Sequence, residues 1–347
     1  MGTPKRRIFF WGLMIIIIAL VPFAAGCGDS EEVITLRYAS AMPEFVAPSQ
    51  FAIHFMNYVE EKSGGRVKFK TYHAGLLGEI FEMLNLVSTG AIDMTLITHP
   101  IFKEQLPLHN FPEDITGGMD KAMDCINKLN FEIPETSSLL EKEYRAINIK
   151  GLNYCALGED GILATTIFNS LADLEGKKLG ADKEIKAYAQ LGFNIVSVTQ
   201  ADMYEALARG VCDALPFAIE AVASNRWYEK AECYMYNSSY HGGFQITVNL
   251  DTWNKLPADI QEILMAAAAD TEAFSVEWDK RKSAEYEQIL KDAGLIVGRL
   301  PESDSSAFLK LSHQIDREDM LAIAKKVGKA EEAKIILKHF DELAGVY

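Results

Sequence analysis

Two stretches of this chain repeat one pattern, and no other feature of the sequence constrains the fold as much. Met83–Met94 and Met203–Ala214 each contain a short helical run, a glycine, two residues, and an aspartate that leads into an apolar strand. Glycine suits the left-handed position that closes a helix, and Val, Ile and Leu suit a buried parallel strand. The repeat predicts two similar α/β lobes with a ligand-binding cleft between them. The alternative interpretation is that the repeat does not indicate two lobes, because any α/β protein repeats helix–strand units.

The first 26 residues predict an export signal. Basic residues at 5–7 precede a 16-residue apolar run at 8–23, which is shorter than the roughly 20 residues of a membrane span. Two alanines and a glycine then precede Cys27, as in a bacterial lipobox, although Ala24 stands where Leu is usual. We expect the signal to be removed, Cys27 to be lipidated, and residues 27–32 to form a tether outside the cytoplasm. Soluble export and an uncleaved helix anchor remain alternatives.

Length and charge narrow the classes of function. A chain of 347 residues is long enough for two domains with hydrophobic cores. A formal net charge of −15 argues against nucleic acid and against an anionic membrane surface as partners. The cysteines beyond Cys27 have no metal-ligand spacing, and we expect free buried thiols, although their pairing cannot be read from sequence. These cysteines are Cys125, Cys155, Cys212 and Cys233.

The apolar and polar pattern of the first third predicts alternating strands and helices. Strands are expected at 33–39, 66–71 and 92–97, with helices at 48–62 and 79–89 between them. This order predicts a parallel sheet with right-handed crossovers. Ligands bind at the carboxyl ends of such strands, which are followed here by loops at 40–43, 72–78 and 98–100.

The rest of the chain predicts a second lobe and a return to the first. A looser region at 104–135 precedes a strand at 149–156 and a loop at 158–161 that we expect to line the cleft. Pro257 begins a helix of about 50 Å that ends near Gly294 and is long enough to brace both lobes. The other expected elements are a helix from 183, a strand at 194–198, a helix at 201–209, strands from 213, at 244–249 and at 295–300, and two terminal helices.

Six motifs, each weak alone, occur together in one order and spacing. They are Gly64–Val67, Ala74–Glu79, Gly90–Met94, Asp173–Lys178, Tyr204–Asp213 and Asn249–Asp259. With them the chain resembles, over nearly all of residues 33–347, the DctP family. Members of that family are the extracytoplasmic solute-binding subunits of tripartite ATP-independent periplasmic (TRAP) transporters.

The resemblance implies an α/β fold with two lobes, of the periplasmic-binding-protein type (type II-like), with hinge strands and a long helix spanning both lobes. It implies that the first lobe comprises 33–155 plus 244–285, and that the second comprises 156–243 plus 286–347 with C-terminal cap helices. It also implies that a small solute is trapped by hinge closure and passed to TRAP membrane subunits, without an enzymatic step or a cofactor.

The chain departs from the family pattern where the family holds a ligand carboxylate. The family's usual Arg after Gly-x-Lys-(Ile/Leu) is Gly180 here, its Asn aligns with Phe217, and its other Arg falls near apolar residues 162–163. We favour a neutral, aromatic or amine solute over an organic acid held by a clamp that has moved to Arg37 or Lys183. The acidic partners expected for such a solute are Glu79, Glu159 and Asp182.

Residues at the predicted cleft edges form the candidate ligand site, although each also has an ordinary structural explanation. By contrast, Asp93 and Asp213 are expected to be structural, because each caps the turn into a strand. The candidate residues are Ser40, Met42, Glu79, Thr98, His99, Tyr154, Cys155, Glu159, Gly180, Asp182, Pro216, Phe217 and Phe244.

Motifs for catalysis are missing from the sequence. It contains no G-x-S-x-G nucleophile elbow, no phosphate-binding Gly-rich motif after the first strand, and no histidines at metal-ligand spacing. We therefore expect a binding protein without catalytic or metal residues. A sensory solute-binding protein that serves a receptor kinase is the main alternative, and an enzyme on the same fold is a weaker one.

Overall fold

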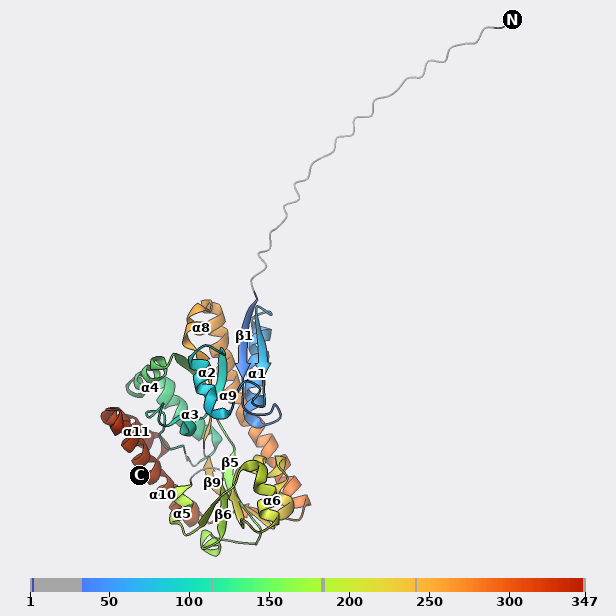
Figure 1. Cartoon of the computed structure of the whole chain (residues 1–347), viewed down its shortest axis with the longest axis vertical. Coiled ribbons are helices and arrows are strands. Elements are labelled where there is room, and N and C mark those ends of the chain that lie inside the picture. The colour runs from blue at the N-terminus through green and yellow to red at the C-terminus, as the bar shows by residue number, and fades with distance from the viewer. Residues whose placement is uncertain are drawn as a thin grey trace. The chain divides into compact units, whose positions relative to one another are not determined.

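The structure is a computed structural model, and most of the chain is described in it. Residues 33–347 form one compact unit, and residues 1–32 form a separate one (Figure 1). The predicted signal, Cys27 and the tether lie outside the described residues, as do Asp182 and Lys183. No helix within the described ranges is long and apolar enough to cross a membrane. The described residues are Gly2 and 33–345, except 114, 116, 182–184 and 241.

Five strands form the first sheet, in the order β2-β1-β3-β10-β4. Strand β1 pairs in parallel with β2 and β3, whereas β10 runs antiparallel to β3 and β4. Helices α1 (Ala47–Lys62) and α2 (Met83–Ser88) connect the first three strands, which confirms the predicted β-α-β-α-β order. The strands are β1 (Ile34–Ala39), β2 (Val67–Tyr72), β3 (Met94–Ile97), β4 (Ile149–Ala156) and β10 (Gly243–Asn249).

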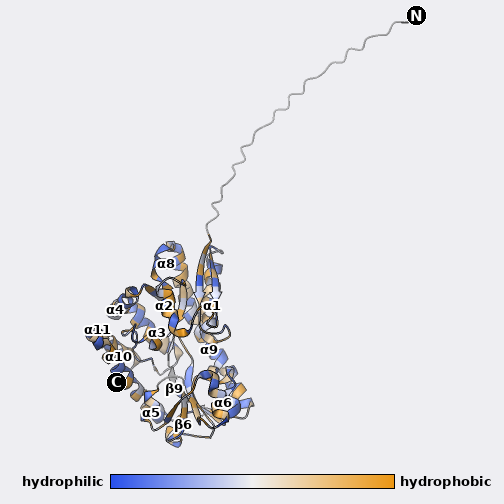
Figure 2. Cartoon of the chain, in the orientation of Figure 1, coloured by the Kyte–Doolittle hydropathy of each residue, from blue (hydrophilic) through white to orange (hydrophobic). Residues whose placement is uncertain are grey.

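Helix α1 illustrates how the sequence sets these layers. Pro48 occupies its first turn, where a missing N–H costs nothing, and Gly64 follows its end with φ of 62°. Phe51, Phe55 and Val59 recur at helical spacing and are buried on one face. Burial of each such side chain stabilises the fold by about 2 kcal/mol. The outer helices in Figure 2 show the same mixture of hydrophobic and hydrophilic residues along their length.

Six strands form the second sheet, in the order β11-β9-β5-β8-β6-β7. The loop predicted at 158–161 is wrong from Glu159 onward, because β5 begins there and pairs with β8 and β9. Gly161 belongs in this strand because a Cβ atom would lie 2.5 Å from the Tyr234 ring. The strands are β5 (Glu159–Ala164), β6 (Lys178–Ala181), β7 (Asn194–Ser197), β8 (Ala214–Pro216), β9 (Cys233–Tyr240) and β11 (Ile296–Arg299).

The chain crosses between the sheets at β4 to β5, at β9 to β10, and through α9 (Ala258–Asp292). This 35-residue helix contacts α1 and β4 of the first sheet's layer, and α7 (Ile219–Ser224) and β11 of the second. At 1.5 Å per residue it spans roughly 50 Å. The prediction of two α/β lobes with a long helix spanning both is therefore confirmed.

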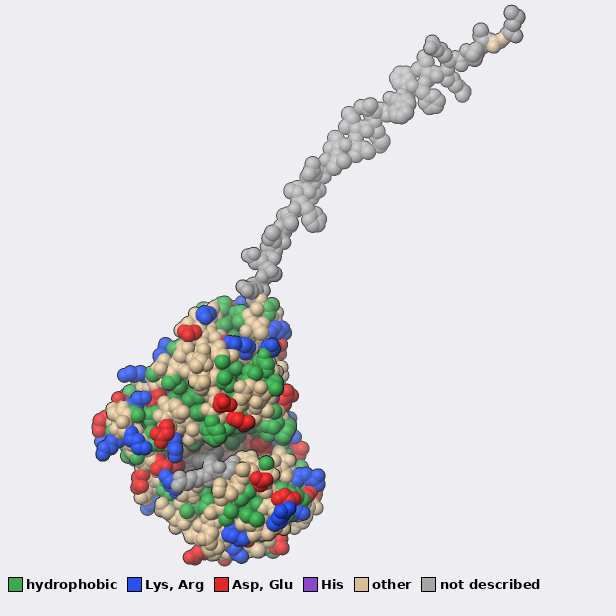
Figure 3. Space-filling model, viewed as in Figure 1, with side chains coloured by type: hydrophobic (Ala, Val, Ile, Leu, Met, Phe, Trp, Pro, Cys, Tyr) green, Lys and Arg blue, Asp and Glu red, His purple; other side chains and the backbone are tan. Residues whose placement is uncertain are grey.

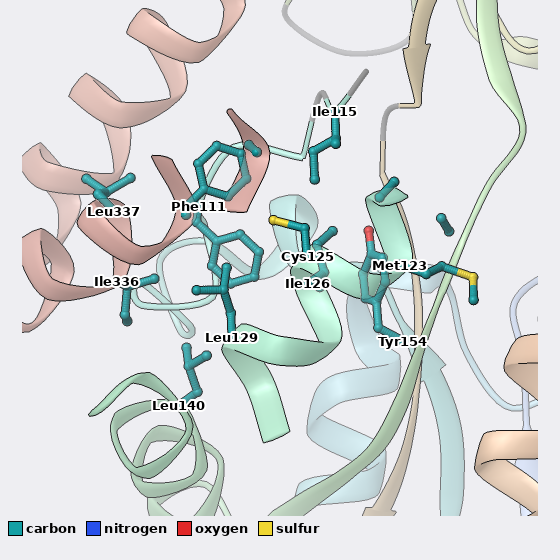
Figure 4. Close-up of a cluster of buried hydrophobic side chains, with 14 of the residues drawn as sticks. Phe111, Ile115, Met123, Cys125, Ile126, Leu129, Leu140, Tyr154, Ile336 and Leu337 are labelled. Atoms are coloured by element: carbon teal, nitrogen blue, oxygen red, sulfur yellow. The ribbon is translucent and has the colours of Figure 1, made fainter. Parts of the chain in front are cut away.

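The region predicted to be loose at 104–135 is irregular over its described residues up to 118 and helical from there on. Helix α3 (Met119–Asn127) continues through a π-helical turn, Lys128–Glu132, and α4 (Pro134–Ala146) follows. Their apolar side chains, among them Leu129 and Leu140, form a buried cluster with residues far along the chain (Figure 4). The prolines before α3 led to the prediction of a loop for the whole region. A proline disfavours a helix only close to its own position, so it does not exclude the helix that follows.

The two terminal helices contact different parts of the fold. Helix α10 (Glu302–Lys326) contacts β9 and α5 (Lys186–Gln190), on the side of the second sheet. Helix α11 (Ala330–Ala344) contacts α3 and α4, where Ile336 and Leu337 enter the cluster of Figure 4. The predicted division of the chain places α11 in the second lobe, but α11 contacts α3 and α4, which that division places in the first. The exact division between the lobes stays a prediction. The remaining α-helices of the described residues are α6 (Met203–Ala208) and α8 (Leu250–Lys255).

Candidate functional site

A cavity of about 270 Å³ lies between the segment that follows β3 and the second sheet. Residues within 100–113 form the first wall, and Asp160 of β5, Pro216 of β8 and the start of α5 form the second. Helix α10 lines one side. The volume lies near the lower limit of small-molecule sites, about 300 Å³. Figure 3 shows one face of the folded unit hollowed between the part with the first sheet and the part with the second.

The charged side chains of this cavity are mostly acidic. Lys186 binds both carboxylate oxygens of Asp319 on α10, at 2.8 and 3.0 Å, and Lys103 lies 3.9 Å from the same carboxylate. One aspartate is therefore shared by two lysines from opposite walls. The full charged set is Lys103, Lys186, Glu113, Asp160, Asp316 and Asp319.

A cluster of buried polar side chains lies behind the first wall. His99 Nε2 lies 2.8 Å from the Tyr144 hydroxyl and 3.0 Å from Gln245 Oε1. Its other ring nitrogen, Nδ1, lies 3.5 Å from Oε1 of Glu113, which lines the cavity. Because Gln245 Oε1 can only accept, Nε2 of His99 donates to it. The hydrogen-bonded network of His99, Tyr144 and Gln245 therefore lies directly behind Glu113 in the cavity wall, although no hydrogen bond joins His99 to Glu113.

A second buried pair, His109 and Glu143, lies deeper in this cluster. His109 Nδ1 lies 3.0 Å from Glu143, and Lys329 lies 2.6 Å from the same carboxylate. Burial lowers the pKa of His109 to about 4, although the hydrogen bond to Glu143 acts in the opposite direction. Burial alone would raise the pKa of Glu143, but His109 and Lys329 hold it below its usual value. His109 is therefore neutral at pH 7, and Glu143 is an anion compensated by Lys329.

Of the predicted site residues, the structure places Pro216 in the wall of this cavity. Glu159 lines a much smaller space between α1 and α7 and forms an ion pair with Arg299, with Nη2 at 2.8 Å. Asp182 lies outside the described residues. The other described candidates do not line this cavity. The candidate set as a whole stays a prediction.

The candidates on the first sheet's loops have identifiable structural roles. The Ser40 hydroxyl accepts the Met42 N–H at 3.1 Å in the loop after β1. Glu79 is exposed and forms a capping box with Glu82 at the start of a short 3₁₀ helix. Thr98 is partly buried where β3 ends, next to the buried His99. Of these residues, His99 comes nearest to the cavity wall, through its contact with Glu113.

Three candidates, Tyr154, Cys155 and Phe244, are buried in hydrophobic cores, and a fourth, Phe217, is partly buried. Tyr154 and Cys155 lie in β4, and Cys155 pairs in register with Phe244 of β10. Phe217 is partly buried and packs edge-to-face on Trp227, with ring centroids 5.1 Å apart. Their side chains pack with neighbouring elements, so packing accounts for these positions without a ligand.

Gly180 sits where its sheet packs closely against neighbouring side chains. A Cβ atom at this position would lie 2.9 Å from both Cys212 Sγ and Leu215 Cδ2. A larger residue here would have to displace that core. The Arg37 guanidinium, one proposed substitute clamp, is bound to Asp93 and to the carbonyl groups of Gly90 and Ala91. Arg37 is thus already bound to the repeated turn of the first lobe.

Sequence reasoning missed most of the cavity's charged residues. Glu113 lies within the stretch predicted to be loose at 104–135, and Asp316 and Asp319 lie on a helix predicted to be only a cap. No spacing rule connects residues 113, 160 and 319, because the fold alone brings them together. A possible signal was the strand end at Ile97, since the segment that follows a parallel strand often lines a site.

The four described cysteines are buried and free, as expected. Burial raises the pKa of Cys125 to about 12 and that of Cys212 to about 11, so these thiols stay protonated at neutral pH. Within the described ranges, no group of three or more His, Cys, Asp or Glu side chains could hold a metal ion.

Comparison with known proteins gives a family match over most of the folded unit. Residues 47–320 match the profile of bacterial extracellular solute-binding proteins, family 7, named DctP. The C4-dicarboxylate-binding periplasmic protein DctP of Rhodobacter capsulatus is 24% identical over 270 residues, which cover 76% of this chain and 79% of the relative.

Solved structures share the fold at lower identity. A TRAP periplasmic solute-binding protein from Desulfovibrio salexigens, in an open complex, has a TM-score of 0.79 and 21% identity, covering 91% of this chain and 97% of that one. A Bordetella pertussis extracytoplasmic solute receptor that binds pyroglutamic acid, DctP6, has a TM-score of 0.74 and 18% identity, covering 89% and 99%. The likeness confirms the two-lobe fold.

Proposed function

Because this chain belongs to the bacterial extracellular solute-binding proteins of family 7, the DctP family, we propose that it is the solute-binding subunit of a TRAP transporter. In this role it captures a small organic solute outside the cytoplasm and delivers it, unchanged, to the membrane subunits. The observation that carries the proposal is the cavity of about 270 Å³, which has one wall from each lobe.

The connections between the lobes support capture by hinge closure. Two strand-to-strand crossings and α9 join the lobes, so a rotation about them would open the cavity without disrupting either sheet. Polar contacts also bridge the two walls: Glu220 of α7 accepts the Ala47 N–H at 3.2 Å, and Lys103 faces Asp319. A solute that touches both walls would add to these contacts and favour the closed state.

The proposal includes a lipid anchor at Cys27. Removal of residues 1–26 would leave Cys27 as the first residue, followed by a polar tether that ends where β1 begins at Ile34. Such an anchor would hold the folded unit near the membrane subunits. Mass spectrometry of the protein expressed in a bacterium tests this point, because a Cys27→Ser variant would lose the lipid mass and leave the membrane fraction.

Native mass spectrometry of the chain from residue 28 onward tests the binding function directly. We expect a bound small molecule that is released on denaturation. An Ile315→Trp variant, which fills the cavity from α10, should lose that molecule. The matched control is Ile335→Trp on α11, where Ile335 is 40% exposed and does not line the cavity. Retention of the molecule by Ile315→Trp would contradict binding in this cavity.

A further inference from the structure

We propose that the cavity is selective for a solute with a cationic group, such as a protonated amine attached to an apolar body, and that Glu113 is the wall carboxylate that determines this preference. The inference rests on the proposed function, because it assigns a ligand class to the same cavity. It differs from the carboxylate solutes named for relatives such as the C4-dicarboxylate-binding protein.

The balance of charge in the cavity favours a cation. Among the described residues that line it, four side chains are acidic and two are basic, and none of these residues is an arginine. Both lysines face Asp319, and Lys186 makes two hydrogen bonds to it. An anionic solute would have to compete with Asp319 for these lysines and would lie near the buried carboxylate of Glu113. A cationic solute would leave the contact with Asp319 intact and would be attracted by Glu113.

Glu113 distinguishes this cavity from a merely acidic surface. Only 2% of this residue is exposed, and neither carboxylate oxygen has a hydrogen-bond partner among the described residues. The nearest ring nitrogen, His99 Nδ1, lies 3.5 Å from Oε1. A Cβ atom on Gly242 would lie 3.4 Å from Oε2, so the backbone of Gly242 lies close to the carboxylate. A buried carboxylate without hydrogen bonds is costly, and a cation in the adjoining cavity would reduce that cost.

The environment of Glu113 holds a second polar group without a partner. The Tyr154 hydroxyl is buried beside the Glu113 carboxylate, but the two are not in good hydrogen-bond geometry. Burial and, next, the charge of Glu113 and the polar contact with it raise the pKa of Tyr154 well above its usual value. A tyrosine side chain is either neutral or anionic, so Tyr154 cannot balance the charge of Glu113.

Aromatic side chains in the cavity suit the rest of such a solute. Tyr188 of α5 and Phe308 of α10 both line it, and their ring centroids lie 4.6 Å apart. Phe111 contributes a third ring from the first wall. Aromatic faces attract organic cations and also bury apolar groups. The combination of a buried carboxylate and aromatic rings fits an arylalkyl or alkyl amine better than a dicarboxylate.

The test compares two probes of one shape and opposite charge, phenethylamine and 3-phenylpropionate. Calorimetry uses the chain from residue 28 onward, which contains the whole compact unit, after removal of any co-purified solute. We expect phenethylamine to bind at least tenfold more tightly than 3-phenylpropionate. Glu113→Gln should remove at least tenfold of the amine's affinity without weakening the carboxylate. The matched control is Glu262→Gln, at an exposed glutamate on α9 outside the cavity lining.

Each outcome decides the inference. Tighter binding of 3-phenylpropionate, equal binding, or binding of neither probe overturns the cationic preference, as does amine binding that Glu113→Gln leaves unchanged. If Glu113→Gln does not fold, Asp160→Asn, on the opposite wall, should weaken the amine severalfold instead. The proposed function fails separately, namely when Ile315→Trp retains every co-purified solute. A carboxylate that binds tightly and is excluded by Ile315→Trp would preserve the proposed function and remove this inference.

Discussion

The two repeated units, Met83–Met94 and Met203–Ala214, fold alike but are stabilised by different side chains. Gly90 and Gly210 adopt φ of 73° and 67°, as a helix-closing glycine should. In the first unit, Oδ2 of Asp93 accepts the backbone N–H of Arg37 at 2.8 Å. In the second, Oδ2 of Asp213 accepts the backbone N–H of Lys178 at the same distance. The aspartate therefore joins each unit to the neighbouring strand, whereas the sequence predicted only a cap on the turn into its own strand.

The difference lies in the basic residue. The Arg37 guanidinium binds both oxygens of Asp93, at 2.8 and 3.0 Å, and also two carbonyl groups of the turn. The Lys178 ammonium binds the Gly210 carbonyl. Burial alone would raise the pKa of Asp93, but hydrogen bonds from Arg37 and Thr252 hold it below its usual value. The comparison shows that a backbone hydrogen bond defines this turn and that an ion pair strengthens one copy.

The largest expected effect separates the two aspartates. Asp93→Ala should lower the free energy of unfolding by about 3 kcal/mol, because the Arg37 backbone N–H loses its acceptor and the guanidinium loses the carboxylate that balances its charge. Asp213→Ala should cost about 1.5 kcal/mol, because only hydrogen bonds to neutral groups are lost. Urea denaturation followed by circular dichroism measures both. Equal losses would break the comparison, and Glu262→Ala on the surface of α9 serves as the control.

The pH dependence of stability tests the same ion pair. The pKa of Asp93 is lower in the folded state than in the unfolded chain, so its contribution is fully present above the unfolded pKa of about 3.9. That contribution is lost as the pH falls through the lower, folded pKa. The stability gap between the wild-type protein and Asp93→Asn should therefore be constant from pH 7 to pH 5 and shrink below pH 4. Urea titrations at each pH measure the gap, and a gap unchanged at pH 3 would refute the role of charge.

Local patterns along the chain were sufficient to predict the β-α-β-α-β order of the first sheet and α9, but not α3, α4, β5, α7 or β9. The strands and helices of that order were predicted because their apolar periodicity and glycine ends are local signals, as in α1 and at Gly90. Gly161 misled the prediction, because a glycine marks either a loop or a close approach within a sheet. Here the approach of Tyr234 requires it. Such contacts between distant residues cannot be read from a single sequence.

The candidate site was less accessible to sequence than the fold. Pro216 was predicted because it follows a strand of the second repeat. Glu113 and Asp319 were not predicted, since they come from an irregular segment and from a helix about 200 residues later. Their approach depends on the packing of α10 against α5 and β9, which no local pattern encodes.

Replacing the glycine of either repeat by alanine should lower the stability of the protein by the same amount. Gly90→Ala and Gly210→Ala should each cost about 1 kcal/mol, because a residue with a Cβ is strained at positive φ. A Cβ atom on Gly90 would meet the Asn249 amide at 3.6 Å, an ordinary contact, and one on Gly210 would meet nothing within 4 Å. Thermal unfolding measures both variants. A difference between them of more than about 1 kcal/mol would mean that the two turns are not equivalent.

The smallest expected effect concerns Lys178. Lys178→Met should cost about 0.5 kcal/mol, because it removes the ammonium's hydrogen bond to the Gly210 carbonyl and keeps both backbone bonds between residues 178 and 213. The control for the loss of a positive charge is Lys177→Met, at the residue directly before β6. Urea denaturation again gives the free energies. A loss above about 1.5 kcal/mol would mean that the second repeat depends on its basic residue in the way the first does, and the ion pair would no longer distinguish the two lobes.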